Sequence, residues 1–403
     1  MTKAILLAAR AHACARHDPR LLAQRLQDGP LPALVPALTP MIGAHDPMDF
    51  PSSSHDRRRL MQALACWPIT LMLPALSACG GGDADRGATP QATVQDRRVP
   101  LRTGVALHVR DWNPGNAERV VVLLAGQGET AQLFNGLAAA LADRARVLAV
   151  SRRGFGQSDK PLPSRGWRYD TAALVDDLDG LLAALHVGSV VLCGHSIAGN
   201  ELTLFAGRYP QRVRGLVYMD TTYDYSLAKR DPSRVPRNPA LLSPDPQAAD
   251  GASFAAAVAF AKRIHKTWSP AIEANLRDAC EVLPNGSVRP ATPSEVSIVT
   301  LTEAMRFSPD YSAVRAPALI LQADPRGLRD LFPWLTEPVD AQTREDAQMR
   351  LRESRQDRER NFEALSAALP DSRRIVIANS NHGEFFIEHQ AEVVEAIESM
   401  PWY

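Results

Sequence analysis

The stretch Val190-Val191-Leu192-Cys193-Gly194-His195-Ser196-Ile197-Ala198-Gly199-Asn200 decides how this 403-residue chain is interpreted. Its first four residues are apolar and predict a short buried strand, and the residues that follow it have helical character. The turn between them carries Ser196 at its centre, where a strained backbone requires near neighbours that are almost free of side chains. Gly194, Ala198 and Gly199 meet that need. The pattern indicates a nucleophile elbow, although Ala198 replaces the glycine usual in G-x-S-x-G, and a chance match in a glycine-containing loop is the alternative.

Composition restricts the class of protein. The chain has 45 basic and 45 acidic residues, so no net field draws it to nucleic acid, and we expect no nucleic-acid partner. Its length suits one large α/β domain with additional segments. The five cysteines form no C-x-x-C pair and show no metal-ligand spacing, which argues against a disulfide framework and against a metal site.

The amino-terminal segment has the pattern of an export signal. Residues 1–40 show no clean period and are interpreted as a targeting segment, or as residues upstream of a true start at Met41 or Met48. Arg57-Arg58-Arg59 then precedes an apolar run over residues 63–76. A charged region followed by an apolar run too short to span a bilayer is typical of a signal peptide.

The end of this run resembles a bacterial lipobox, in the sequence Leu76-Ser77-Ala78-Cys79. In such motifs small residues admit a signal peptidase, and the cysteine thiol accepts a diacylglycerol. We interpret residues 1–78 as an untranslated or targeting segment plus the export signal, and residues 79–96 as a flexible tether. We therefore expect an exported protein that a lipid anchor at Cys79 holds in the bacterial cell envelope. Gly80 favours the outer membrane by resemblance to Gram-negative sorting, and an ordinary signal peptide or a buried helix is the alternative.

Strands alternate with helices in the remaining chain. The expected strands cover residues 105–109, 120–124, 147–150, 190–193, 213–219, 318–321 and 374–378. Helices are expected over residues 171–185, 341–368 and 384–397 among others, and the charged helix 341–368 is interpreted as a solvated outer face. This alternation predicts a parallel sheet with helices on both faces.

Four landmarks occur in the order in which one family carries them. They are Leu124-Ala125-Gly126-Gln127-Gly128, Arg153-Gly154-Phe155-Gly156-Gln157-Ser158-Asp159-Lys160-Pro161, Gly194-His195-Ser196-Ile197-Ala198-Gly199 and Ala378-Asn379-Ser380-Asn381-His382-Gly383. On these residues the chain resembles the α/β-hydrolase fold over residues 97–403. The resemblance implies a mostly parallel twisted sheet with helices on both faces, and a helical cap over residues 221–313, inserted after the sixth strand.

The chemistry expected of this pattern needs a nucleophile and a base. Ser196 is the candidate nucleophile, and an imidazole is suited to take its proton at neutral pH. His382 lies in a loop directly after the last expected strand, where the fold places its base. His195 is inside the elbow and is expected to point away from the reacting atoms.

Two carboxylates are candidates for the third member of the triad. Asp220 ends the strand expected over residues 213–219, and Asp324 follows the strand expected over residues 318–321; in the order of the family these are the sixth and the seventh strand. Most relatives carry the acid after the seventh strand in a G-x-x-D step, but Asp324 comes too early for that spacing and Arg326 occupies the expected place. Some relatives, including some haloalkane dehalogenases, take the acid from the sixth strand. Asp220 is preferred and both remain open.

An oxyanion needs two preorganised donors. We expect them to be the backbone N–H groups of Ile197, after the nucleophile, and Gln127, in the loop after residues 120–124. Ala125 stands where many relatives carry His.

These residues together predict a serine hydrolase that cleaves a small carboxylic ester through an acyl-enzyme, with no cofactor and no metal. The alternatives are the same fold acting on amide, thioester or carbon–carbon bonds or as a cofactor-free perhydrolase, or a non-catalytic, surface-anchored binding protein. Fold does not decide the substrate, and the oligomeric state is not determined by the sequence.

Overall fold

The computed structural model describes residues 93–116, 118–227 and 236–402. The export signal, the lipidation site at Cys79 and most of the tether expected over residues 79–96 lie outside the described residues. None of the helices in the described part combines the length and the apolar character that crossing a membrane requires.

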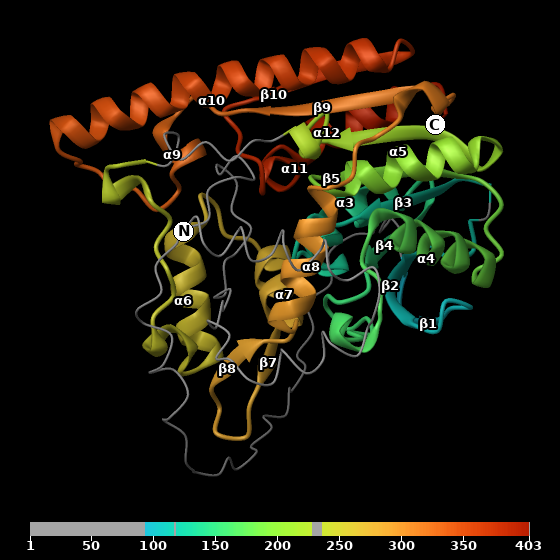
Figure 1. Ribbon diagram of the computed structural model, residues 1–403, viewed down its shortest axis with the longest axis horizontal. Coiled ribbons are helices and arrows are strands. Elements are labelled where there is room, and N and C mark those ends of the chain that lie inside the picture. Colours follow the sequence, from blue (N-terminus) through green and yellow to red (C-terminus); the bar gives the residue numbers. More distant parts are fainter. Residues whose placement is uncertain (1–92, 117, 228–235, 403) are drawn as a thin grey trace, which may run out of the picture. The chain divides into compact units, whose positions relative to one another are not determined.

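A twisted sheet of eight strands forms the centre of the fold (Figure 1). Its strands are β1 (Val94–Pro100), β2 (Ala106–Trp112), β3 (Val120–Leu124), β4 (Arg146–Ser151), β5 (Val190–His195), β6 (Val213–Met219), β9 (Ala318–Asp324) and β10 (Ser372–Ala378). They lie in the order β1-β2-β4-β3-β5-β6-β9-β10. β2 pairs antiparallel with β1 and β4, and the remaining pairs are parallel. The mostly parallel sheet is confirmed.

The first strand begins earlier than expected. β1 starts at Val94, inside the segment interpreted as the end of the tether, and it pairs with β2 from Val94 opposite Trp112 to Pro100 opposite Ala106. The polar residues that made this segment look like a linker belong to an edge strand, where charged side chains face solvent. The sheet therefore includes residues from Val94 onward, and not only from Arg97.

Helices cover both faces of the sheet, as expected. Residues Val120, Val122 and Leu124 of β3 join one core cluster, and Val121 and Leu123 join the other, because successive side chains of a strand point to opposite faces. The first cluster includes residues of α4 (Thr171–Ala184), α5 (Ala198–Arg208) and α10 (Ala341–Ala368). The second includes residues of α3 (Asn135–Leu141), α11 (Phe385–Glu388) and α12 (Gln390–Glu398).

An insertion separates β6 from β9, where the cap was expected. Its helices are α6 (Phe254–Ile264), α7 (Pro270–Ala279) and α8 (Ser294–Ala304), with 3-10 turns at Tyr225–Leu227, Pro239–Leu241, Ala248–Gly251 and Tyr311–Ala313. It also contains an antiparallel hairpin of β7 (Cys280–Val282) and β8 (Val288–Pro290), which the sequence analysis did not predict. The hairpin turn depends on Gly286, whose φ is 83°.

Helix α10 combines the expected solvated face with a buried one. Its bounds, Ala341–Ala368, agree with the prediction, and Asp340 caps it by accepting from Thr343 N at 2.9 Å. One face is nevertheless buried, through Ala347, Leu351, Phe362 and Leu365 among others. α10 runs alongside β9 and β10 in Figure 1, so this face packs against the sheet while the charged face is the solvated outer face that the sequence predicts.

The remaining short elements connect these layers. They are the 3-10 turns at Ala131–Phe134, Pro163–Arg165 and Pro210–Arg212, and the single helical turn α9 (Leu328–Leu331).

Candidate active site

Ser196 lies at the apex of the turn between β5 and α5 with a φ of 55°, a left-handed conformation that only a constrained turn imposes on a serine. Thr221 Oγ1 donates to the Ser196 carbonyl at 2.8 Å. A Cβ at Gly199 would lie 2.2 Å from Thr221 Oγ1, and one at Gly194 would lie 2.5 Å from a side-chain carbon of Leu202. The close approaches fall at these two glycines, which explains why the elbow tolerates Ala198.

His382 lies in the loop after β10 and contacts one of the two candidate carboxylates. Its Nδ1 is 2.6 Å from Oδ2 of Asp220, which is buried at the end of β6. The other oxygen of Asp220 accepts from Ala323 N at 2.9 Å. The Asp220 backbone has a φ of 50° and donates to Leu321 O at 2.8 Å.

Asp324 has different partners. It ends β9 and accepts from Arg326 Nε at 2.8 Å and Arg355 Nε at 2.9 Å. Since β6 lies directly beside β5, its carboxyl end is one strand nearer to Ser196 than the end of β9. The structure therefore brings Asp220 to His382 and leaves Asp324 in a separate pair of salt bridges.

The charges around His382 favour a neutral imidazole. Burial lowers the pKa of His382, the hydrogen bond to Asp220 acts in the opposite direction, and the positive charges of His195 and Arg358 add to the lowering. Burial by itself raises the pKa of the Asp220 carboxyl, but Arg358 and His382 outweigh it and hold that pKa well below its ordinary value. A neutral imidazole next to an ionised carboxylate is the state that a general base requires.

His195 has a partner that the sequence analysis missed. Its Nδ1 is 2.8 Å from Glu129 Oε2, and its Nε2 is 2.9 Å from the backbone carbonyl of His382. Burial opposes both charges, but mutual attraction lowers the pKa of Glu129 and raises that of His195. The result is a buried ion pair that fixes the backbone of the loop carrying His382, with the ring centroids of His195 and His382 4.7 Å apart.

The two expected oxyanion donors lie in well-fixed loops. Arg152 donates to the carbonyls of Ala125 and Gly126 at 2.8 Å each, which holds the loop before Gln127. Within the described part of the chain, the backbone N–H groups of Gln127 and Ile197 take part in no internal hydrogen bond. They are left available to a ligand.

The cap insertion contacts this site directly. The Gln127 side chain donates to Ser297 O of α8 at 3.0 Å. Tyr225, also in the insertion, has a phenol whose pKa is raised by burial. Its hydrogen bonds to Thr221, Thr222 and the Ser196 side chain offset part of this rise.

The contacts among the described residues do not include a hydrogen bond from Ser196 to His382. In serine hydrolases this contact often tightens only when substrate binds.

No group of three His, Cys, Asp or Glu side chains in the described segments is arranged to hold a metal ion. Cys193 is fully buried beneath the elbow, and burial raises the pKa of its thiol, so it packs rather than reacts.

No pattern in the sequence marks Arg358 or Glu129 as a site residue. Arg358 belongs to a charged run on α10 that resembles an ordinary solvated helix face, and Glu129 becomes a partner of His195 only when the loop after β3 lies against β5.

Comparison with known proteins identifies the family of this fold. A family model described as alpha/beta hydrolase fold matches residues 119–388. The chain belongs to the α/β-hydrolase family.

Curated relatives of this α/β hydrolase match over part of their length. It is 32% identical over 126 residues to a 2-(acetamidomethylene)succinate hydrolase of Mesorhizobium japonicum, which is 31% of this chain and 42% of the relative. It is 35% identical over 123 residues to a 2-hydroxy-6-oxo-2,4-heptadienoate hydrolase of Pseudomonas putida, which is 30% of this chain and 43% of the relative. The matched segment thus spans less than half of these relatives.

Solved structures show the same fold. A crystal structure of E-2-(acetamidomethylene)succinate hydrolase has a TM-score of 0.54 at 22% identity, covering 76% of this chain and 98% of that one. The thioesterase domain from the curacin biosynthetic pathway has a TM-score of 0.53 at 15% identity, covering 76% and 100%.

Proposed function

We propose that this α/β hydrolase is a serine esterase that cleaves small carboxylic esters through an acyl-enzyme, with Ser196, His382 and Asp220 as its triad. The observation that carries the proposal is the pairing of His382 with buried Asp220 at 2.6 Å, on strand ends beside the strained Ser196 turn. The hydrolase names of the relatives support the reaction class.

The proposed mechanism begins with His382 Nε2 taking the proton of the Ser196 hydroxyl as the oxygen attacks the ester carbonyl. The carbonyl π electrons move to oxygen, and the N–H groups of Gln127 and Ile197 stabilise that oxyanion, each contributing about 3 kcal/mol. Collapse breaks the bond to the alcohol, which leaves with the proton from His382. A water molecule, deprotonated by His382, then releases the acid and restores Ser196.

The proposal is tested with p-nitrophenyl esters of increasing acyl length. Ser196→Ala should lower kcat by about 10⁴-fold or more, and the exposed Ser164→Ala should not change it. A fluorophosphonate probe should add to Ser196 in the wild type, as read by peptide mass spectrometry. Unchanged hydrolysis by Ser196→Ala contradicts the mechanism, and absence of both hydrolysis and labelling favours a binding protein.

We further propose that the protein is exported and held in the cell envelope by a lipid anchor at Cys79. The lipobox-like sequence before a glycine-rich tether supports this. Cys79→Ser should move the protein from the membrane to the soluble fraction and remove the mass of the lipid. Identical fractionation of the variant and the wild type contradicts the anchor.

A further inference from the structure

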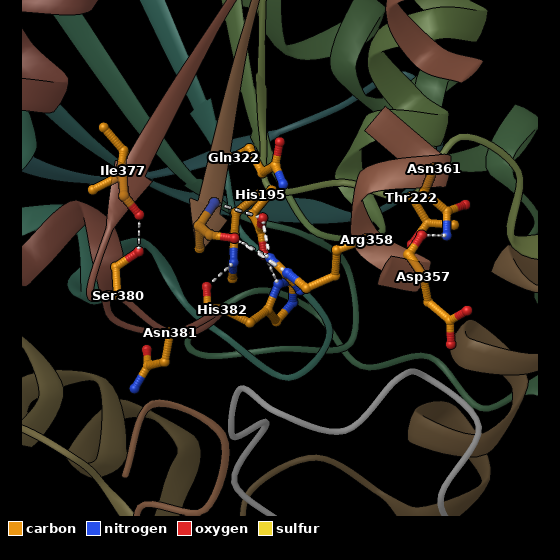
Figure 2. A network of polar contacts seen from close by, with 12 residues as sticks. His195, Thr222, Gln322, Asp357, Arg358, Asn361, Ile377, Ser380, Asn381 and His382 are labelled. Carbon is orange, nitrogen blue, oxygen red and sulfur yellow. Dashed lines mark hydrogen bonds and ion pairs between the residues drawn. The ribbon is translucent and has the colours of Figure 1, made fainter. Parts of the chain in front are cut away.

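Arg358 extends from α10 to the carboxylate that holds His382. Its Nη2 donates to both oxygens of Asp220, with Oδ2 at 2.5 Å, and to Ala323 O at 3.0 Å. Figure 2 shows Arg358 and His382 on one network of polar contacts that also includes His195. Asp220 is 1% exposed and Arg358 is 22% exposed, so this pair is largely shielded from water.

The contacts leave the Asp220 carboxylate with a single orientation. Arg358 binds both oxygens, Ala323 N donates to Oδ1, and Oδ2 faces His382 Nδ1. Hydrogen bonds from three directions prevent the carboxylate from rotating away from the imidazole. The site therefore does not depend on the usual seventh-strand acid position to hold its base.

Arg358 also changes the charge that His382 experiences. A lone carboxylate stabilises the imidazolium, but a guanidinium bound to the same carboxylate cancels part of that attraction. The other charged groups that face His382 are His195 of β5 and its partner Glu129 in the loop after β3. The positive charge of His195 lowers the pKa of His382, as that of Arg358 does. Asp324 lies on the neighbouring strand and is neutralised by its own arginines.

We propose that Arg358 is a positioning residue that locks Asp220 against His382 and extends catalysis to lower pH by disfavouring protonation of the base. This inference rests on the triad proposed above. Arg358 touches neither the nucleophile nor the oxyanion donors, and it acts through Asp220.

The same helix supplies a matched control. Arg355 lies on α10 and binds Asp324 through Nε at 2.9 Å and Nη2 at 3.3 Å. It resembles Arg358 in charge, helix and type of partner, but its carboxylate does not contact His382. Arg355→Gln therefore removes one α10 arginine without touching the proposed triad.

The test is the pH profile of kcat/KM for p-nitrophenyl ester hydrolysis by the full chain, for wild type, Arg358→Gln, Arg358→Lys and Arg355→Gln. Loss of the guanidinium raises the pKa of His382, so Arg358→Gln should move the acid limb of the kcat/KM profile to higher pH than in wild type. Arg358→Lys keeps the positive charge, so the acid limb of the kcat/KM profile should stay at its wild-type pH while the maximal kcat/KM is lower. Arg355→Gln should reproduce the wild-type limb.

Direct titration of His382 separates this inference from the proposed function. The imidazole resonance of His382, assigned with a His382→Gln variant, should titrate at higher pH in Arg358→Gln than in wild type. If Ser196→Ala abolishes activity while Arg358→Gln shifts neither the limb nor the resonance, the inference about Arg358 is wrong. If Ser196→Ala stays active, the proposed function fails, and the NMR shift still decides the effect of Arg358 on His382. If Arg358→Gln does not fold, a wild-type plateau in Arg358→Lys overturns the positioning role.

Discussion

Replacing each candidate acid by asparagine should separate Asp220 from Asp324 by several orders of magnitude in rate. Asp220→Asn is nearly isosteric, but it replaces the carboxylate that accepts the Nδ1 proton of His382 at 2.6 Å. An amide group there favours the wrong tautomer, in which Nε2 carries the proton and cannot accept that of Ser196. We expect kcat to fall about 10⁴-fold, equivalent to about 5 kcal/mol of transition-state stabilisation.

Asp324→Asn should leave catalysis nearly unchanged, although Asp324 is itself buried. Its partners Arg326 and Arg355 have side chains that are 52% and 47% exposed, so water can solvate their charges when the carboxylate is replaced. We expect kcat to stay within about twofold of wild type, since no contact of Asp324 reaches His382.

The assay is steady-state p-nitrophenyl ester hydrolysis near neutral pH, with circular dichroism to establish that both variants are folded. A loss of activity confined to Asp324→Asn, with Asp220→Asn close to wild type, would contradict the assignment of Asp220 as the acid. It would mean that the His382–Asp220 contact does not operate in catalysis.

The effect of Asp220→Asn on the free energy of unfolding should depend on pH. The pKa of Asp220 is lower in the folded protein than in the unfolded chain, so its ionisation stabilises the fold above the unfolded value near 4. This contribution is lost as the pH falls through the folded value. Thermal unfolding should therefore show that Asp220→Asn costs stability at pH 7 and that the difference from wild type narrows in acid.

Two further perturbations follow from the same geometry. Glu129→Gln leaves His195 buried without its anionic partner and should lower the free energy of unfolding, measured by urea titration, by about 3–5 kcal/mol. It should also lower kcat, because His195 supports the loop that carries His382. Stability equal to wild type would mean that the pair is not charged. Gly199→Ala places a methyl group 2.2 Å from Thr221 Oγ1 and should cost about 1–3 kcal/mol and disturb the elbow, whereas Gly188→Ala, with nothing within 4 Å of the added carbon, should melt like wild type. Equal melting temperatures for the two alanine variants would contradict the packing argument.

The sequence by itself determined the fold class and the order of the site residues along the chain. Apolar runs such as residues 120–124 and 190–193 are buried on both faces of a parallel sheet, so their composition alone identifies them as strands. Ser196 could also be identified from local sequence, because the strained turn requires small residues within a few positions of the serine. The location of His382 directly after the last strand was also visible in the sequence.

The tertiary structure decided which carboxylate meets His382 and what surrounds it. Asp220 directly follows β6 and Asp324 is the last residue of β9, so both lie at the same edge of the sheet. The distinction comes from strand order, since β6 lies next to β5 and β9 lies one strand farther away. Arg358 joins the site across 138 positions of sequence, on a helix whose charged pattern is that of a solvated face. Long-range pairing of this kind leaves no periodicity or spacing in the chain, because it is set by how α10 packs against the sheet.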